Sequence, residues 1–196
     1  GSKIAFYSNK DGPLSIFWQK ADGSGGLEKL TSSDYTRIPM SWSADGQLLC
    51  FYEVNPTTGY DIWVLDMKDR KAAPFLRTPF YEGLPRFSPD GHWLAYTSNE
   101  SGRYEVYVQP YPGPGGKWQI STDGGMDAVW SNNGRELTYR NGDKMVAVDI
   151  TTQPGFSAGK PHTLFEGPYQ LGLSPIAAYD VSPDGAHLLL IRNTEA

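Results

Sequence analysis

The chain has 196 residues, of which 17 are Lys or Arg and 22 are Asp or Glu, so its formal net charge is −5. A pI near 5.1 without a basic cluster argues against a surface for nucleic acid or for an anionic membrane. The longest apolar runs, 48–52 and 188–191, are far shorter than the ~20 residues that span a bilayer. The single cysteine, Cys50, excludes an internal disulfide and a multi-cysteine metal site.

A five-residue motif occurs four times along the chain, at 42–46, 87–91, 130–134 and 181–185. Each copy has Ser at its second position, Asp or Asn at its fourth and Gly at its fifth, and the glycines are separated by 45, 43 and 51 residues. Asp and Asn hydrogen-bond to nearby backbone in turns, and Gly tolerates a positive φ. We therefore interpret Asp45, Asp90 and Asp184 as turn residues and not as metal ligands. Counting one repeat back from Gly46 reaches Gly1, so we expect the chain to begin at the end of a further turn.

Three strands are predicted after Gly1 and after each of the first three motif glycines, and one strand is predicted after Gly185. The first is short and apolar, the second alternates with period two and the third is brief, and all are rich in β-branched and aromatic residues. The first strands are expected at 4–7, 48–52, 93–96, 137–139 and 188–191. The second are expected at 15–18, 61–64, 105–108 and 144–148, and the third at 29–31, 75–77, 118–120 and 163–165. Because no long stretch has a helical apolar period, helix is expected to be nearly absent.

Together with the strand that carries the motif, each repeat supplies four short antiparallel strands, which is typical of a β-propeller blade. We predict an all-β fold, a β-propeller of four-stranded antiparallel blades with about four to five blades present. The predicted boundaries are 1–35 (without its first strand), 36–81, 82–124, 125–170 and 171–196 (first two strands only). The leftover end strands overlap instead of completing one blade, so we expect an incomplete or open ring, a fragment of a larger one. Its edges at 4–7 and 188–191 are expected to pair with another chain, as in a homo-oligomer.

The Ser-Pro-Asp-Gly turns, with the strands at 93–98 and 105–108, resemble the TolB-like, WD40-like (PD40) propeller repeats. The segments 154–161 and 179–185 resemble the closing part of propellers appended to bacterial Ser/Thr-kinase-like receptors. Three positions depart from the repeat pattern: Pro39 stands one residue early, Ala128 replaces Pro, and Val181 replaces Trp. The resemblance implies a sensor or scaffold module of a larger bacterial protein, in a periplasmic or other extracytoplasmic setting.

The residues that usually carry catalysis or bind metal form no recognisable constellation. His92, His162 and His187 belong to different repeats and lack metal-ligand spacing. The Gly-x-Ser-x-Gly sequence at 155–159 is not followed by an expected helix, which a nucleophile elbow requires, and Cys50 lies within an apolar strand, where a buried inert thiol is expected. We therefore predict a protein without catalytic residues, metal or cofactor, whose partner is a protein or a peptide.

The loops at one end of the strands supply candidate binding residues, since Tyr, Met and Arg are enriched in interfaces. Arg86 and Asp180 hold equivalent places in the motif strands and are expected to face the channel. The predicted binding set is Tyr35, Arg37, Tyr81, Glu82, Arg86, Asn99, Arg103, Met126, Asp127, Tyr169 and Asp180, with Asn55, Tyr60, Glu100, Asp123 and Gln170 on neighbouring loops. The alternative interpretation, that these residues belong to ordinary solvated loops without a binding role, fits the sequence equally well. The alternative function is a propeller that positions substrate for a prolyl-oligopeptidase-like hydrolase domain outside this chain, and a weaker one is a carbohydrate-acting enzyme.

Overall fold

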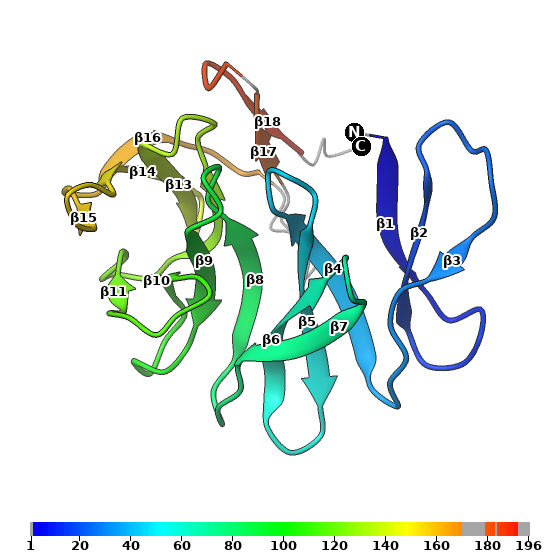
Figure 1. Cartoon of the computed structure of the whole chain (residues 1–196). Coiled ribbons are helices and arrows are strands. Elements are labelled where there is room, and N and C mark those ends of the chain that lie inside the picture. Colours follow the sequence, from blue (N-terminus) through cyan, green and yellow to red (C-terminus); the bar gives the residue numbers. More distant parts are fainter. Residues whose placement is uncertain (1, 170–178, 183, 192–196) are drawn as a thin grey trace. The chain divides into compact units, whose positions relative to one another are not determined.

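The computed structural model describes residues 2–169, 179–182 and 184–191 (Figure 1). These residues form strands, turns and loops without a helix, which confirms the all-β prediction. Accordingly, the described ranges contain no helix that is long and apolar enough to cross a membrane. The chain divides after Glu82 into two compact parts.

The first part contains two antiparallel sheets. One has the order β1 (Lys3–Ser8), β2 (Ser15–Lys20) and β3 (Glu28–Lys29). The other has the order β4 (Thr36–Trp42), β5 (Leu48–Asn55), β6 (Gly59–Asp66) and β7 (Lys71–Leu76). Ile16, Leu30, Leu49, Phe51 and Leu65 form the buried core where these two sheets pack together. Side chains alternate between the two faces of a strand, and the apolar faces of these two sheets pack against each other.

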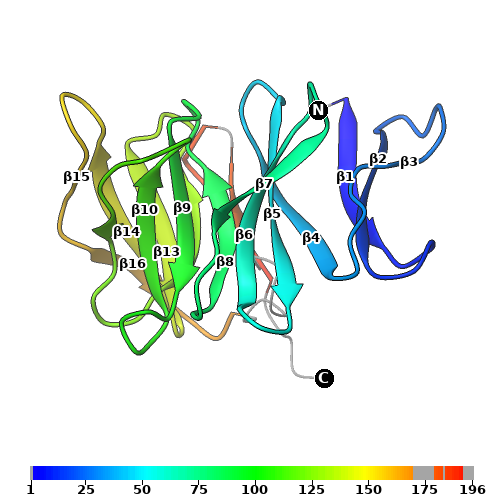
Figure 2. The same ribbon diagram turned by 60° about the horizontal axis from the view of Figure 1, so that its bottom comes forward.

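The second part contains two larger sheets and a two-stranded one. The first of them runs β8 (Glu82–Phe87), β9 (Trp93–Ser98), β10 (Glu105–Pro110) and β11 (Trp118–Gln119). The next contains β12 (Met126–Trp130), β13 (Glu136–Asn141), β14 (Lys144–Thr151), β15 (Ser157–Ala158) and β16 (His162–Glu166), and the last pairs β17 (Tyr179–Val181) with β18 (Leu188–Leu190). Figure 2 shows the first two side by side, and Ala95, Val106, Trp130, Leu137 and Val148 belong to their shared core.

The four motif turns have the same hydrogen bonds. In each, the Ser hydroxyl donates to the carboxylate or amide oxygen two residues later, as in Ser43–Asp45 at 2.6 Å and Ser131–Asn133 at 2.9 Å. That oxygen also accepts from a backbone N–H two residues further on. The glycine that follows has φ between 69 and 73°, which a residue with a Cβ adopts only with strain. The structure thus confirms the turn interpretation, including Asn133 in place of Asp.

Two local features were not predicted. The short strand β15 pairs with β14 inside the long connection to β16, and Phe156 just before it packs on Trp93 and Trp118. The motif strands β4 and β12 carry bulges, and Asp127 within the second bulge has a φ of 58°. A bulge shifts the register by one residue, which accounts for the early position of Pro39 in the repeat pattern.

Candidate binding site

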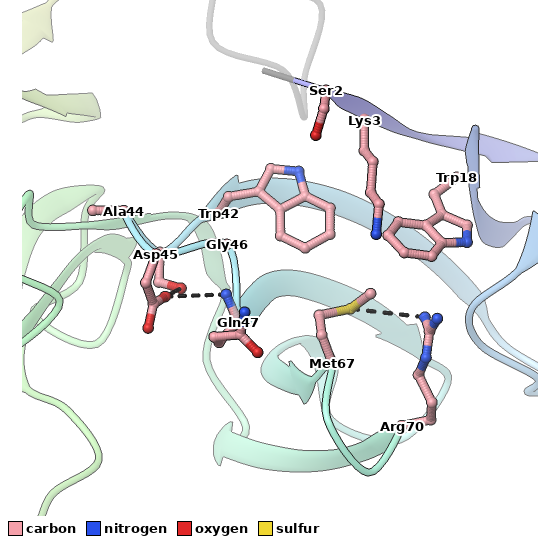
Figure 3. A pocket seen from close by; sticks show the side chains of 11 residues that line it. Ser2, Lys3, Trp18, Trp42, Ala44, Asp45, Gly46, Gln47, Met67 and Arg70 are labelled. Carbon is pink, nitrogen blue, oxygen red and sulfur yellow. Dashed lines mark hydrogen bonds between the residues drawn. The ribbon is translucent and has the colours of Figure 1, made fainter. Parts of the chain in front are cut away.

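A pocket of about 630 Å³ lies in the first part of the chain, at the end of the strands where the Asp45–Gly46 turn is found (Figure 3). Its walls come from β1, β2, β4, the turn after β4 and the loop after β6. The lining residues are Ser2, Lys3, Trp18, Trp42, Ser43, Ala44, Asp45, Gly46, Gln47, Met67 and Arg70. The pocket thus combines apolar surface, from two indole rings and a thioether, with two basic side chains, one on β1 and one on the loop after β6.

Trp18 is the centre of the charged side of the pocket. The Lys3 ammonium lies 3.5 Å from the centre of its ring, and the Arg70 guanidinium carbon lies 4.7 Å from it. Glu28 accepts a hydrogen bond from the Trp18 indole N–H and pairs with Arg70 at 3.0 Å. Arg70 therefore has a carboxylate partner, whereas Lys3 forms no ion pair with any residue in the described ranges. Lys3 is the cation that the pocket can offer to a ligand.

The opposite side of the pocket is formed by the turn after β4, whose polar groups bind one another. The Asp45 carboxylate accepts from the Ser43 hydroxyl at 2.6 Å and from the Gln47 backbone N–H at 3.0 Å. The Ser43 hydroxyl also accepts from the Leu48 backbone N–H at 2.9 Å. The hydrogen bond from Ser43 lowers the pKa of Asp45 below its ordinary value, so the carboxylate is charged at neutral pH. The Ser43 hydroxyl and the Oδ1 atom of Asp45 on this side therefore already have partners within the turn.

The reason for the open space is visible in the second part of the chain, where the same position is filled. Strand register makes Trp93 the counterpart of Lys3, Val108 of Trp18 and Trp118 of Glu28. In the second part, Trp93 and Trp118 lie 5.5 Å apart, and Phe156 from the next sheet covers both at 4.8 Å. Three aromatic rings close that junction, whereas Lys3 and Glu28 leave the junction in the first part polar and hollow.

The structure gives most of the charged loop residues in the first part an internal partner. Arg37 pairs with the buried Glu53 at 2.7 Å, and its guanidinium lies 5.4 Å from the rings of Phe51 and Trp63. Glu82 was expected on an exposed loop, but it is 1% exposed at the start of β8 and accepts from Thr78. The prediction of a solvent-facing carboxylate at Glu82 is therefore wrong. Burial becomes tolerable because the Thr78 side chain and backbone both donate to it.

The tyrosines in the loops of the first part form a partly exposed cluster. Tyr35, which immediately precedes β4, is 38% exposed. The ring of Tyr81 lies 4.8 Å from that of Tyr60, which in turn lies 5.6 Å from that of Tyr52. Asn55 is buried, and its side-chain oxygen accepts from the backbone N–H of Thr57. Since Asn55 ends β5 and the Asp45 turn precedes it, this tyrosine cluster and the pocket lie at opposite ends of the same strand.

In the second part, Arg103 also binds within the protein. It pairs with the buried Glu105 at 2.7 Å and with Asp123 at 3.3 Å. Glu100, on the same loop, pairs with Lys117. Asn99 is half-buried in this turn, where its carbonyl oxygen accepts from the Gly102 backbone N–H. The charged groups of this loop are therefore used in holding it together.

Asp127 was likewise expected on an exposed loop, but it lies in β12 with 6% of its surface exposed. The prediction of an exposed position is wrong because the bulge and the positive φ turn this residue inward. Burial raises the pKa of its carboxyl to about 6, against the opposing effect of the Arg140 and Arg86 charges. Met126 beside it is half-buried.

The remaining predicted residues have separate surroundings. The carbonyl oxygen of Arg86 accepts from the Trp130 indole N–H at 3.1 Å, and the Arg86 residue is half-buried. The ring of Tyr169 packs edge-on against that of Phe165 at 5.6 Å. Asp180 is exposed, and Gln170 lies outside the described residues. The pocket residues Lys3, Trp18, Trp42 and Met67 were missed. The signal for them was Lys3 at the repeat position where the third repeat has Trp93.

No model of a known protein family matches the chain. The Tol-Pal system protein TolB of Desulfosudis oleivorans is 27% identical over 110 residues, which are 55% of this chain and 24% of that protein. The crystal structure of TolB from Acinetobacter baumannii matches with a TM-score of 0.76 and 22% identity, over 95% of this chain and 45% of that one. A putative TolB from Agrobacterium tumefaciens matches with a TM-score of 0.72 and 19% identity, over 85% and 62%.

These likenesses confirm the predicted fold, a TolB-like β-propeller built from antiparallel four-stranded sheets. The chain spans between about a quarter and less than two thirds of the length of these relatives.

Proposed function

We propose that this TolB-like propeller chain is a non-catalytic module that binds an extended segment of a protein or peptide, as a sensor or scaffold of a larger bacterial protein. The observation that carries the proposal is the pocket formed by Trp18, Trp42, Met67 and Lys3. Trp, Met and Arg are the residue types that are enriched at the centres of interfaces, and Trp and Arg often dominate the binding energy. The likeness to TolB proteins, one of them named as a Tol-Pal system protein, supports an interaction role.

The size and walls of the pocket favour an extended segment. A volume of about 630 Å³ holds a few side chains and lies in the range of ligand pockets. Trp42 and Met67 offer apolar surface, and Lys3 offers a charged donor. A short stretch of chain with mixed side chains satisfies both kinds of wall at once.

The loop end of the strands is the second proposed contact surface, and its character differs from the sequence-based expectation. Arg37 and Arg103 are held in internal ion pairs, and Glu82 and Asp127 are buried. We therefore propose that recognition at this end depends on Tyr35, which is 38% exposed, and on the neighbouring rings of Tyr60 and Tyr81. The edge of β1 that faces away from β2 is proposed to pair with a second copy of the chain, because no described strand covers it.

A peptide library displayed on phage tests the proposed function. We expect the purified chain to enrich defined peptides, and synthetic copies of these peptides to bind in biolayer interferometry. The Lys3→Trp variant copies Trp93 and fills the pocket, so it should fold with an equal or higher melting temperature while losing binding by at least about tenfold. The matched control is Lys10→Trp, which adds the same ring on an exposed turn. Enrichment of no peptide, or equal binding to Lys3→Trp, would overturn the proposal.

A further inference from the structure

The charge distribution around the pocket is unusual for a chain with a net charge of −5. Two basic side chains, Lys3 and Arg70, line it together with one carboxylate, Asp45. Glu28 neutralises Arg70 at 3.0 Å, and Asp45 is held by Ser43 and Gln47 on the far side. The ammonium of Lys3 is left with the face of Trp18 as its neighbour. A cation over an indole ring keeps its N–H donors, because the ring attracts the charge without accepting strong hydrogen bonds.

Lys3 is also placed where it meets a ligand directly. Figure 3 shows its side chain extending from β1 into the space beside Trp42 and Trp18. The corresponding Trp93 in the second part is packed between Trp118 and Phe156, so that junction admits no ligand group. The replacement of a packed indole by a free ammonium gives this junction both the room and the charge for an anionic group.

Resting on the proposed function, we infer that the pocket selects acidic segments: an Asp or Glu carboxylate binds the Lys3 ammonium, and a neighbouring apolar side chain packs on Trp42 and Met67. A carboxylate is the group that complements a lone ammonium with charge-assisted hydrogen bonds. The apolar contact uses Trp42 and Met67, two partly buried side chains that line the pocket. The inference concerns residues that the sequence-based binding set did not contain.

A polyhydroxylated sugar fits the same walls less well. A sugar needs several donors and acceptors, because hydroxyls that are buried without partners cost binding energy. The hydroxyl of Ser43 and the Oδ1 atom of Asp45 already bind within the turn, so Ser2, Gln47 and the other oxygen of Asp45 are the main polar groups left near Lys3. An acidic peptide segment needs one cation and an apolar wall, which are what this pocket supplies.

The test uses the peptides selected against the wild-type chain, synthesised in pairs in which each Asp or Glu is replaced by Asn or Gln. We expect the acidic member to bind the wild-type chain about tenfold more tightly than its neutral partner, as one charge-assisted hydrogen bond implies. In the Lys3→Gln variant the two members should bind equally, and in Lys3→Glu the neutral member should bind more tightly. Lys10→Gln, which removes the same charge from an exposed turn, should behave like the wild type.

The outcomes separate this inference from the proposed function. Selected peptides that lack acidic residues, or whose binding is unchanged in Lys3→Gln while Lys3→Trp still abolishes it, would overturn the acidic preference and leave the peptide-binding role standing. If no peptide binds and a glycan array gives signals that depend on Lys3, both proposals fail and the pocket is a sugar site. Circular dichroism of each variant shows that the differences do not come from unfolding.

Discussion

Asp127 is the buried acid that most clearly couples the protein's stability to pH. The residue lies in β12 with 6% of its surface exposed, and its carboxyl lies near Arg140 and Arg86. The hydroxyl of Tyr179 donates to the backbone carbonyl oxygen of Asp127 at 2.6 Å. Burial penalises the charged form, and this raises the pKa from 3.8 to about 6 although the two arginines act in the opposite direction. The folded chain therefore holds this proton more tightly than the unfolded chain does.

We expect the free energy of unfolding to fall by ~3 kcal/mol as the pH rises from about 4 to above 6, because the folded pKa lies above the unfolded one. The Asp127→Asn variant should lose this part of the pH dependence. Urea unfolding across the pH range measures the free energy of unfolding. The slope of this free energy against pH is compared between the variants, because a loss of stability near Arg140 that is the same at every pH does not change the slope. Asp123→Asn, at an exposed carboxylate, is the control. An unchanged slope in Asp127→Asn would contradict the assignment.

Glu105 holds the loop side of the sheet β8–β11 together. Its carboxylate accepts from the Ser121 hydroxyl, from the Gly124 backbone N–H at 3.0 Å and from Arg103 at 2.7 Å, and Ser121 in turn accepts from the Val106 backbone N–H. Removing the carboxylate leaves these donors inside the protein without their acceptor.

The Glu105→Ala variant should therefore be less stable by ~3 kcal/mol, the effect of breaking a buried ion pair. Glu100→Ala removes the more exposed pair with Lys117 and should cost less than ~1 kcal/mol. Chemical denaturation of both variants measures the contrast. Equal losses in the two variants would show that the network around Glu105 contributes no more than a surface pair.

At the scale of single residues, the sequence was informative about turns and uninformative about burial. The roles of Asp45 and Asn133 follow from their own neighbours, because a turn is closed by residues within a few positions. The burial of Glu82 and Asp127 depends on a bulge and on partners such as Thr78 and Arg140, which no local pattern contains.

At the scale of strands, β1 is an edge strand of its sheet. It pairs with β2 alone, whereas β9 and β5 each lie between two strands. Ile4 on this strand is 53% exposed, and on β18 at the other end of the described chain Leu189 is 76% exposed. A strand edge without a partner, next to exposed apolar side chains, is a template for pairing with another chain.

We expect the chain to form dimers or larger species at high concentration and the Ile4→Lys variant to shift toward the 21.7 kDa monomer. A charge on an edge strand opposes pairing with a like edge. Multi-angle light scattering over a concentration series measures the change. The matched substitution Phe80→Lys, at an exposed apolar side chain outside the strands, is the control. A wild-type chain that stays monomeric throughout would contradict the edge-pairing proposal.

The strands themselves were largely predictable, and β15 was not. The two-residue alternation and the Asp-Gly turns are local signals, and each of the expected first, second and third strands overlaps a strand of the structure. Strand β15 has two residues, and it follows Phe156, which packs on Trp93 and Trp118 of the preceding sheet. Such a contact across sheets cannot be deduced from the pattern along one strand.

At the scale of the whole molecule, stability is expected to be concentrated in the middle strands. The strands β5, β9 and β13 are almost entirely buried, while β3 and β15 are exposed two-residue strands. Each of the two compact parts has its own apolar core. Opening of the short outer strands exposes little apolar surface and should cost little free energy.

Native-state hydrogen exchange should therefore be slowest in β5, β9 and β13, by on the order of 100-fold relative to β3 and β15. Mass spectrometry of peptic fragments resolves these segments. The exposed turns before β2 and β10 serve as unprotected references. Uniform protection along the chain would contradict the picture of stability held in the middle strands.

The pocket was the part of the site that could not be predicted from the sequence. The pocket forms because Lys3, Trp18 and Glu28 lie side by side on three paired strands. It also requires Met67 and Arg70, which lie on the loop after β6 in the neighbouring sheet. The loop residues proposed from the sequence were selected by type and by loop position, and most of the charged ones turned out to be paired or buried.

The contrast between Lys3 and Trp93 also bears on how such proteins diversify. Both residues occupy the same place in the repeat, one beside a hollow and one within a closed aromatic cluster. A chain of repeats offers one such place at each junction, so substitution at a single position can create or erase a cavity there while the other junctions keep the scaffold folded. New recognition can therefore evolve junction by junction, without a cost shared by the whole propeller.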